Sequence, residues 1–335
     1  MKLEDKIKSM KKIELHLHLD GSLRSSTVYD ILNSMDKNNN IVSIEEIKKM
    51  LTVDKNCSSL NQYLERFELP SKVLQTKENL KKVTFELIED LKKENVIYAE
   101  IRFAPQLHIK EGLSFDDIVS SVISGMNEGT KDEKIKCNLI LCCMRGNNNK
   151  KENIDTVHIA KKYLGKGVCA IDLAGAEAIY KTNEFEYIFD LAKKIGVPYT
   201  IHAGEADGKD SIKSAMFFGA KRLGHGIRII EDEKLLKEAI QKNVTLEVCP
   251  TSNLHTKVVS SISLHPVYEL YKLGVNITIN TDNRTVSNTT LENEYKLLLD
   301  NFSFTYEDIL QMNKNAIKAA FLSDVEKEEL LKMLK

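Results

Sequence analysis

Short apolar or β-branched runs recur along the chain and alternate with longer amphipathic segments. Eight runs have the length and composition of buried strands: Ile13–His18, Val96–Phe103, Lys136–Cys143, Val168–Leu173, Val197–Ala203, Arg222–His225, Val244–Cys249 and Asn276–Thr281. Helical periodicity follows several of them, most clearly at Phe185–Ile195, Glu233–Ile240 and Val267–Leu273. This alternation predicts a parallel sheet covered by helices, and eight strands fit a (β/α)8 barrel better than an open doubly wound sheet.

One connection is too long for a regular barrel unit. The stretch Arg24–Val96 lies between the first two predicted strands and contains helical segments at Ile44–Leu51 and Leu60–Phe67. We therefore expect a helical insertion after the first strand, where it could overhang the mouth of the barrel. Since α/β barrels often reach about 250 residues or more as one domain, residues 1–335 are predicted to form a single domain.

Composition and charge exclude several classes of protein. Hydrophobic residues make up 42% of the 335 residues, which is enough for a core, and 48 basic side chains nearly balance 49 acidic ones. Neither nucleic acid nor a membrane surface is therefore expected as a partner. The N-terminus lacks the apolar core of a signal peptide, and none of the six cysteines forms a C-x-x-C pair. We expect a cytoplasmic protein with reduced thiols.

Histidines occur at the C-terminal ends of several predicted strands. The first run leads into His16-Leu17-His18-Leu19-Asp20, and strand alternation places His16, His18 and Asp20 on one face. Two imidazoles on one face can bind one metal ion. An H-x-H pair alone is a weak motif, and strand histidines that contact solvent or hydrogen-bond partners are the more frequent explanation of it.

Three further strand ends carry groups of the same chemical kind. They read His202-Ala203-Gly204-Glu205, Gly224-His225-Gly226 and Asn280-Thr281-Asp282-Asn283. Each alone could be a capped strand end, a tight turn or a helix N-cap. Together they would meet at the C-terminal face of a barrel, where barrel active sites form. Three imidazoles and a carboxylate suit Zn²⁺ with a position left for water, and Glu205 could exchange a proton beside that water.

The motifs HLHLDGSL, LAGAE, HAGE, GHG and NTDN, in this order and spacing, resemble the adenosine deaminase family of zinc-dependent (β/α)8 barrels. CCMR, CPTSN and NAIKAAF are similar to it too, so the resemblance extends from about Ile13 to Phe321. It implies hydrolytic deamination of adenosine and 2′-deoxyadenosine to inosine and 2′-deoxyinosine with release of ammonia, a reaction of purine salvage. It further implies one Zn²⁺ per chain, a purine nucleoside as the small-molecule substrate and no obligate protein partner.

The resemblance assigns roles by position. Zinc would be held by His16, His18, His202 and Asp282. Glu205 would protonate purine N1, and His225 would orient and help to deprotonate the attacking water. The substrate would contact His18, Asp20 at the 5′-hydroxyl, the Gly175 N–H at N3, Asn283 at N7, and Tyr63 and Phe67 as a cover over the pocket. Tyr63 and Phe67 could instead be ordinary core aromatics.

Two positions depart from the family pattern. Asn283 stands where a second aspartate is frequent, and an amide can donate to the acceptor N7 without being protonated. Ala176 replaces a frequent acidic residue, but Glu177 follows it, so we expect only a difference in the loop.

Single sequence features argue for or against other functions. A two-metal amidohydrolase would have a bridging lysine in the fourth strand, which reads Cys169-Ala170-Ile171-Asp172-Leu173. The H-x-E and P-C-x-x-C motifs of cytidine-deaminase-type enzymes are absent. A non-catalytic barrel would have no need of Glu205. A relative that deaminates adenine, methylthioadenosine or a nucleotide remains open, although Asp20 would repel a 5′-phosphate.

Overall fold

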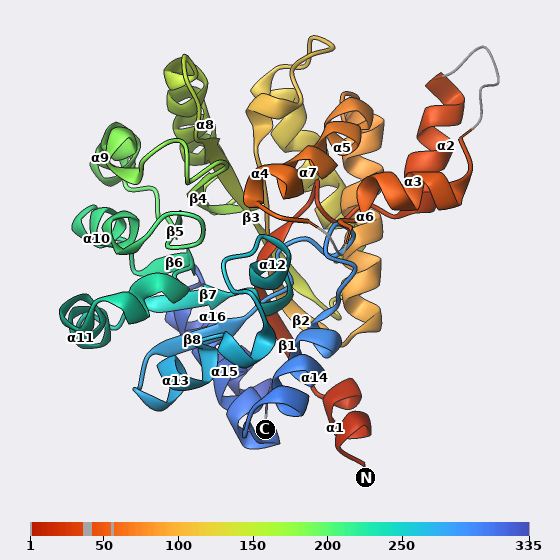
Figure 1. Cartoon of the computed structure of the whole chain (residues 1–335). Coiled ribbons are helices and arrows are strands. Elements are labelled where there is room, and N and C mark those ends of the chain that lie inside the picture. The colour runs from red at the N-terminus through yellow and green to blue at the C-terminus, as the bar shows by residue number, and fades with distance from the viewer. Residues whose placement is uncertain (1, 36–41, 55–56, 335) are drawn as a thin grey trace.

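The computed structural model describes residues 2–35, 42–54 and 57–334. Its strands form two four-stranded parallel sheets, in the orders β1-β2-β3-β4 and β5-β6-β7-β8. The strands are β1 (Lys12–His18), β2 (Val96–Phe103), β3 (Lys136–Met144), β4 (Val168–Ala174), β5 (Ile201–Ala203), β6 (Arg222–His225), β7 (Thr245–Val248) and β8 (Asn276–Ile279). Parallel bridges join the sheets at both seams, between Ile171 and Tyr199 and between Leu17 and Asp282. The strands thus follow one another round a (β/α)8 barrel, which confirms the predicted fold (Figure 1).

All eight predicted strands are present, and the fifth shows the largest difference in extent. It was expected from Val197, whereas β5 begins at Ile201. Pro198 lies within the missing part and has no N–H group to donate to a neighbouring strand. Its carbonyl oxygen accepts from the Ile171 N–H at 2.9 Å, so this stretch still makes an irregular contact with β4.

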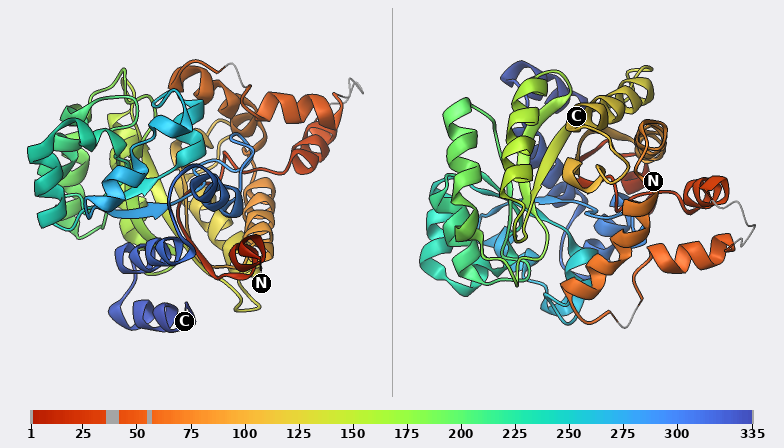
Figure 2. Two further views of the ribbon diagram at one scale, coloured as in Figure 1. Left: turned by 60° about the horizontal axis from the view of Figure 1, so that its bottom comes forward. Right: turned by 90° about the horizontal axis from the view of Figure 1, so that it is seen from above.

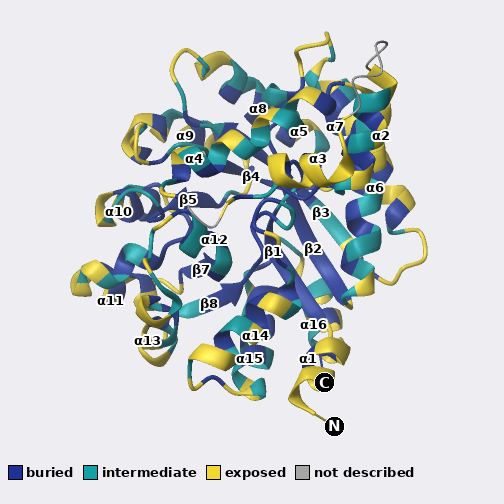
Figure 3. Ribbon diagram, turned by 45° about the vertical axis from the view of Figure 1, so that its right-hand side comes forward, coloured by how far each residue is buried: buried dark blue, intermediate teal, exposed yellow. Residues whose placement is uncertain are grey.

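Helices surround the strands (Figures 1 and 2). They are α1 (Leu3–Ser9), α2 (Ser25–Met35), α3 (Ile44–Leu51), α4 (Leu60–Leu64), α5 (Glu68–Val73), α6 (Lys77–Lys93), α7 (Phe115–Gly129), α8 (Lys150–Tyr163), α9 (Glu186–Ile195), α10 (Lys209–Phe217), α11 (Glu233–Gln241), α12 (Pro250–His255), α13 (Val267–Lys272), α14 (Leu291–Asn301), α15 (Tyr306–Ala319) and α16 (Asp324–Met333). The strands are buried, while the outer faces of the helices are exposed (Figure 3). Among the described residues, no helix combines the length and apolar character that a membrane span requires.

The helical insertion lies between β1 and β2, as expected. It contains α2 to α6, and α2 and α3 project from the side of the barrel (Figure 1). The helix predicted at Leu60–Phe67 divides into α4 and a 3-10 turn, η1 (Glu65–Phe67). The insertion is tied to the connection after β8, because the Val53 N–H donates to the Val286 carbonyl at 2.9 Å.

The last two helices, α15 and α16, close the end of the barrel at which β1 begins. Ile13 and Leu15 of β1 pack in one apolar cluster with Ile317 of α15 and Leu330 of α16. The Asn313 side chain accepts from the Ile13 N–H at 2.8 Å and so pins α15 to the first strand. This packing buries the N-terminal ends of β1 and β2, and the polar groups described below gather at the C-terminal ends of the strands.

The close approach of α6 and α7 depends on a glycine. A Cβ atom at Gly125 would lie 2.2 Å from the carbonyl oxygen of Lys81, which is backbone and cannot turn aside. We expect Gly125→Ala to lower the free energy of unfolding by about 1–3 kcal/mol, the usual cost of overpacking. Ser124→Ala, at an exposed position of the same helix, should change it by less than about 0.5 kcal/mol. Urea denaturation measures the free energy of unfolding of both variants. Equal values for the two would show that α6 and α7 can move apart without an energetic cost.

Candidate active site

The predicted metal-binding residues meet at the C-terminal ends of the strands. His16 and His18 lie on β1, His202 on β5, His225 at the end of β6, and Asp282 after β8. His225 and Asp282 have positive φ angles of 60° and 59°. Such a conformation is energetically costly for residues other than glycine, and strained residues of this kind cluster at functional sites.

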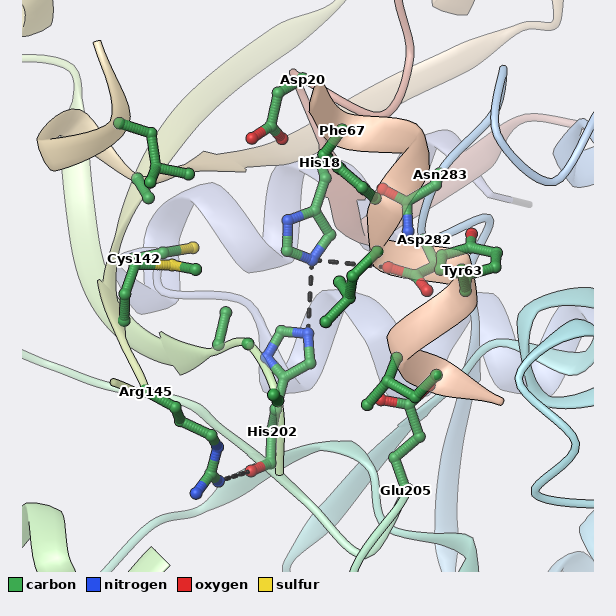
Figure 4. Close-up of a pocket in the computed structure, with 18 of the residues that line it drawn as sticks. His18, Asp20, Tyr63, Phe67, Cys142, Arg145, His202, Glu205, Asp282 and Asn283 are labelled. Atoms are coloured by element: carbon green, nitrogen blue, oxygen red, sulfur yellow. Dashed lines mark hydrogen bonds and ion pairs between the residues drawn. The ribbon is translucent and has the colours of Figure 1, made fainter. Parts of the chain in front are cut away.

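The ligand atoms of these residues are close enough to share one ion. One ligand atom each from His16, His202, His225 and Asp282 all lie within 4.8 Å of one another. His18 belongs to the same cluster, since its Nε2 lies 3.3 Å from Nε2 of His202 and 3.4 Å from Oδ1 of Asp282 (Figure 4). The structure therefore brings together all four predicted ligands, with His225 as a fifth neighbour. The spacing of these groups suits one metal ion.

The chemistry of His16 fits a metal. Its Nδ1 lies 2.8 Å from Oε2 of Glu247, and the imidazole is fully buried. The carboxylate accepts a hydrogen bond from Nδ1–H, so the lone pair on Nε2 is directed into the cluster. Nε2 has no hydrogen-bond partner among the described residues, although its oxygen neighbour in Asp282 is 3.4 Å away. A buried imidazole nitrogen without a hydrogen-bond partner has a lone pair available to coordinate a metal ion.

A buried arginine connects the carboxylates behind two of the histidines. Arg102 of β2 donates to Asp172 Oδ2 at 2.9 Å and to Glu247 Oε2 at 2.8 Å, and all three side chains are inaccessible to solvent. Asp172 Oδ2 in turn lies 2.8 Å from Nδ1 of His202. Burial alone would raise the pKa of both carboxyls, but the charges of Arg102 and its neighbours hold these pKa values below the usual range. Both carboxylates stay ionised and orient one imidazole each.

These supporting residues are not among the site residues predicted from the sequence. Arg102, Asp172 and Glu247 are charged residues inside otherwise apolar strands, and a fully buried charge requires a partner. That pattern was the available signal. Ser252 of α12 is a further supporting residue, because its hydroxyl donates to Asp282 Oδ2 at 2.6 Å. Ser252 lies within the CPTSN motif of the family resemblance, which assigned it no role.

A cavity of about 310 Å³ opens beside the cluster. Its lining includes, of the predicted site residues, His18, Asp20, Tyr63, Phe67, Gly175, His202, Glu205, His225, Asp282 and Asn283. His16 is the exception, because it lies beneath the cluster. The lining is completed by Leu60, Leu64, Ala104, Leu107, Cys142, Met144, Arg145, Ala174 and Ala176. A largely apolar cavity with a few polar groups on one side suits a small, flat organic molecule.

Glu205 is the buried acid of the cavity. It is 4% exposed, and its Oε2 lies 3.5 Å from Nε2 of His225. Burial, with the charges of Asp282 and Glu177, raises its pKa well above that of an ordinary glutamate. The His225 ring is anchored from behind by the Asn253 amide nitrogen, 3.1 Å from Nδ1. Burial thus favours the protonated carboxyl group at a place where it lines the cavity and lies beside His225.

Asp20 lies at a different part of the cavity lining (Figure 4). Its Oδ1 is buried without a hydrogen-bond partner in the described part of the chain, and burial raises the pKa of Asp20 to about 7. Arg24, the cation nearest in sequence, pairs with Asp90 instead, at 2.7 Å from both carboxylate oxygens. The unsatisfied oxygen of Asp20 can therefore accept a hydrogen bond from a hydroxyl group of a ligand.

The remaining predicted contacts come from two loops, after β4 and β8, and from the helical insertion. Asn283 Oδ1 is buried without a partner among the described residues, and a Cβ at Gly21 would lie 1.8 Å from it, so only glycine fits there. Gly175, with φ of +105°, exposes backbone to the cavity. Tyr63 and Phe67 come from α4 and η1 and form part of the wall, and the Tyr63 hydroxyl lies 2.7 Å from Oγ of Ser287.

A (β/α)8 barrel with imidazoles and a carboxylate clustered at its strand ends is the architecture of a metal-dependent amidohydrolase. The family model described as adenosine deaminase matches residues 11–335. The chain belongs to the adenosine deaminase family.

Relatives and solved structures agree with this assignment. An adenosine deaminase from Haemophilus ducreyi is 44% identical over 323 residues, which cover 95% of this chain and 94% of the relative. The N6-methyl-AMP deaminase from Arabidopsis thaliana is 27% identical, with a TM-score of 0.87 over 99% of this chain and 98% of that one. An amidohydrolase from Burkholderia ambifaria with bound Zn has a TM-score of 0.88 at 21% identity, over 100% and 94% of the two chains, and shows the fold alone.

The bridge made by Arg102 is open to test. Arg102→Met leaves the buried Asp172 without its guanidinium partner and Glu247 with Arg222 alone, so the free energy of unfolding should fall by about 3–5 kcal/mol. Metal affinity should fall about 10- to 100-fold, because the carboxylates beside both imidazoles lose the guanidinium that holds them. Arg102→Lys keeps a charge but cannot bridge both carboxylates in the same geometry, so it should give a milder loss of both.

The control is Arg24→Gln, which breaks the half-exposed pair with Asp90. It should cost at most about 1 kcal/mol and leave metal affinity unchanged. Urea denaturation and competition with a chelator give the two quantities. Wild-type metal affinity in both Arg102 variants would show that the bridge does not orient the ligands.

Proposed function

We propose that this protein catalyses the hydrolytic deamination of adenosine and 2′-deoxyadenosine to inosine and 2′-deoxyinosine, with release of ammonia. The observation that carries the proposal is that the buried Glu205 carboxyl, whose pKa is raised, lines the same cavity as His18, His202 and Asp282 of the cluster. Membership of the adenosine deaminase family supports it. A cytoplasmic location suits the six free cysteines and is proposed on that ground.

The metal we propose is one Zn²⁺, held by His16, His18, His202 and Asp282. Imidazole nitrogens and a carboxylate oxygen are ligands that zinc accepts, and the related amidohydrolase with bound Zn supports this choice. Zinc supplies Lewis acidity, which makes water a nucleophile near neutral pH. His225 is then free to contact the attacking water, while Asn253 keeps its ring in place.

The side chains of the protein move the protons. Asp282 and His225 orient the water toward C6 of the purine and help to deprotonate it. As the oxygen attacks C6, electron density shifts onto N1, and Glu205 donates its proton there. The C6–N bond then breaks and ammonia leaves with a proton from the water. The second proton of the water restores the Glu205 carboxyl, so the acid is ready for another cycle.

Substrate contacts follow from the lining of the cavity. Purine N3 and N7 are both hydrogen-bond acceptors, so each requires a donor from the protein. The Gly175 N–H would donate to N3, and the Asn283 amide would donate to N7. Asp20 would accept from the 5′-hydroxyl, and His18 would contact the base next to the metal. Tyr63 and Phe67 would cover the ring and exclude water from the reacting atoms.

The second candidate is deamination of a 5′-nucleotide, because one structural relative is an N6-methyl-AMP deaminase. The charges beside Asp20 argue against it. Arg24 is committed to Asp90, so it does not offset the repulsion between Asp20 and a phosphate. Adenine or methylthioadenosine would leave the Asp20 oxygen without its hydroxyl partner, and a buried polar group left unpaired costs binding energy.

The proposed reaction is tested by the change in absorbance when purified protein is mixed with adenosine. We expect turnover to inosine with close to one Zn²⁺ per chain by elemental analysis. Removal of the metal by a chelator should abolish turnover, and added Zn²⁺ should restore it. Zinc-loaded protein that leaves adenosine unchanged would disprove the proposed reaction.

The acid is tested by Glu205→Gln, which keeps the shape but cannot donate a carboxyl proton. We expect kcat to fall roughly 10²- to 10⁴-fold with the metal retained. In the wild type, activity should decrease as pH rises through the raised pKa of Glu205, because the carboxyl must be protonated when substrate binds. That limb of the pH profile should be absent in the variant, and near-wild-type turnover would mean that another group protonates N1.

The 5′ end of the substrate is tested by comparing kcat/KM for adenosine, 2′-deoxyadenosine, AMP and 5′-deoxy-5′-methylthioadenosine. The first two should react well and the last two much more slowly, since a site built to bind a hydroxyl discriminates strongly against analogues that lack it. Asp20→Ala should narrow the gap between adenosine and the methylthio compound. Equal kcat/KM for AMP and adenosine in the wild type would make a nucleotide deaminase the better assignment.

A further inference from the structure

Glu177 is a buried carboxylate, 1% exposed, that the proposed mechanism does not use. It follows β4, and both of its oxygens accept hydrogen bonds from the connection between β5 and α10. The donors are the N–H groups of Gly204 (2.7 Å), Glu205 (2.9 Å), Ala206 (2.7 Å) and Asp207 (3.0 Å), and the hydroxyl of Ser211. Four consecutive main-chain N–H groups thus converge on one side chain.

These N–H groups belong to the loop that carries the proposed acid. Consecutive N–H groups that point to one side form an anion-binding concavity, and here the anion is supplied by the chain itself. The chain enters this loop through Gly204, which has a φ of +79°. A Cβ at this position would lie 2.4 Å from Cδ1 of Ile212. The path of residues 204–207 is therefore set by glycine on one side and by the carboxylate of Glu177 on the other.

We propose that Glu177 is a positioning residue for Glu205: it holds the main chain of residues 204–207 so that the Glu205 carboxyl reaches the substrate. This inference rests on the proposed function, in which Glu205 protonates N1. A small displacement of a catalytic group lowers the rate steeply, so the hydrogen bonds of Glu177 would matter for kcat more than for substrate binding. The negative charge of Glu177 acts in the same direction, because it helps to raise the pKa of Glu205.

Glu177→Gln is the discriminating change. It has almost the same shape but no charge, and its NH2 group cannot accept from the N–H groups that the second oxygen now serves. We expect kcat to fall about 10- to 100-fold with KM and metal content little changed. Glu177→Asp keeps the charge and both acceptors on a side chain one methylene shorter, so it should recover part of the lost kcat.

A double-mutant cycle separates positioning from general support of the fold. If Glu177 acts through Glu205, then adding Glu177→Gln to Glu205→Gln should lower kcat by no more than about threefold. The matched control is Glu294→Gln, another fully buried glutamate, which accepts the Thr251 N–H at 3.0 Å. Glu294→Gln should change kcat by the same factor in the wild type and in Glu205→Gln. Independent, multiplying effects of Glu177→Gln and Glu205→Gln would overturn the proposal.

Hydrogen exchange provides a readout that does not depend on activity. In Glu177→Gln, the amides of residues 204–207 should exchange faster than in the wild type, while those of the β6 and β7 strands should not change. Unchanged exchange in residues 204–207 would overturn the proposal even if kcat falls. Should the wild type fail to deaminate adenosine, the proposed function fails, and this measurement still decides whether Glu177 holds the loop.

Discussion

The contact of Arg102 with Asp172 and Glu247 is the constraint on which the metal site depends. A guanidinium group without access to solvent needs negative partners, and two carboxylates without access to solvent need a cation. The three groups therefore hold one another in place inside the barrel. Because each carboxylate also faces the Nδ1 of a histidine, the bridge determines how His16 and His202 present their Nε2 atoms. The same three side chains therefore balance the charge in the interior and set the ligand geometry at the metal site.

Carboxylates at this end of the barrel behave differently because their partners differ. Asp172 and Glu247 face arginines and stay ionised, whereas Glu205 is buried near Asp282 and Glu177 and its pKa is raised. One side-chain type can therefore serve as an ionised support beneath the metal and as a protonated acid above it. The same principle extends to Glu177, whose carboxylate accepts hydrogen bonds from consecutive main-chain N–H groups.

The strands and the cluster at their ends could be predicted because both leave local patterns. Buried parallel strands appear as short apolar runs, and residues at their C-terminal ends meet wherever the strands close into a barrel. The prediction was less accurate where chain geometry intervened. Pro198 delays the start of β5 to Ile201, and the segment Leu60–Phe67 changes from α4 to a 3-10 turn. Neither difference displaces a residue that lines the cavity.

The sequence by itself determined the eight strands, the residue types at their ends and the resemblance to one family, since each depends on neighbours a few positions apart. Only the tertiary structure decided what stands behind those residues. Arg102 meets Asp172 across 70 positions and Glu247 across 145, and Glu177 reaches the loop of Glu205 across 28. Contacts at such separations leave no spacing to recognise. They arise because a buried charge or an unpaired N–H group is costly, and the folded chain must bring it a partner from wherever one lies.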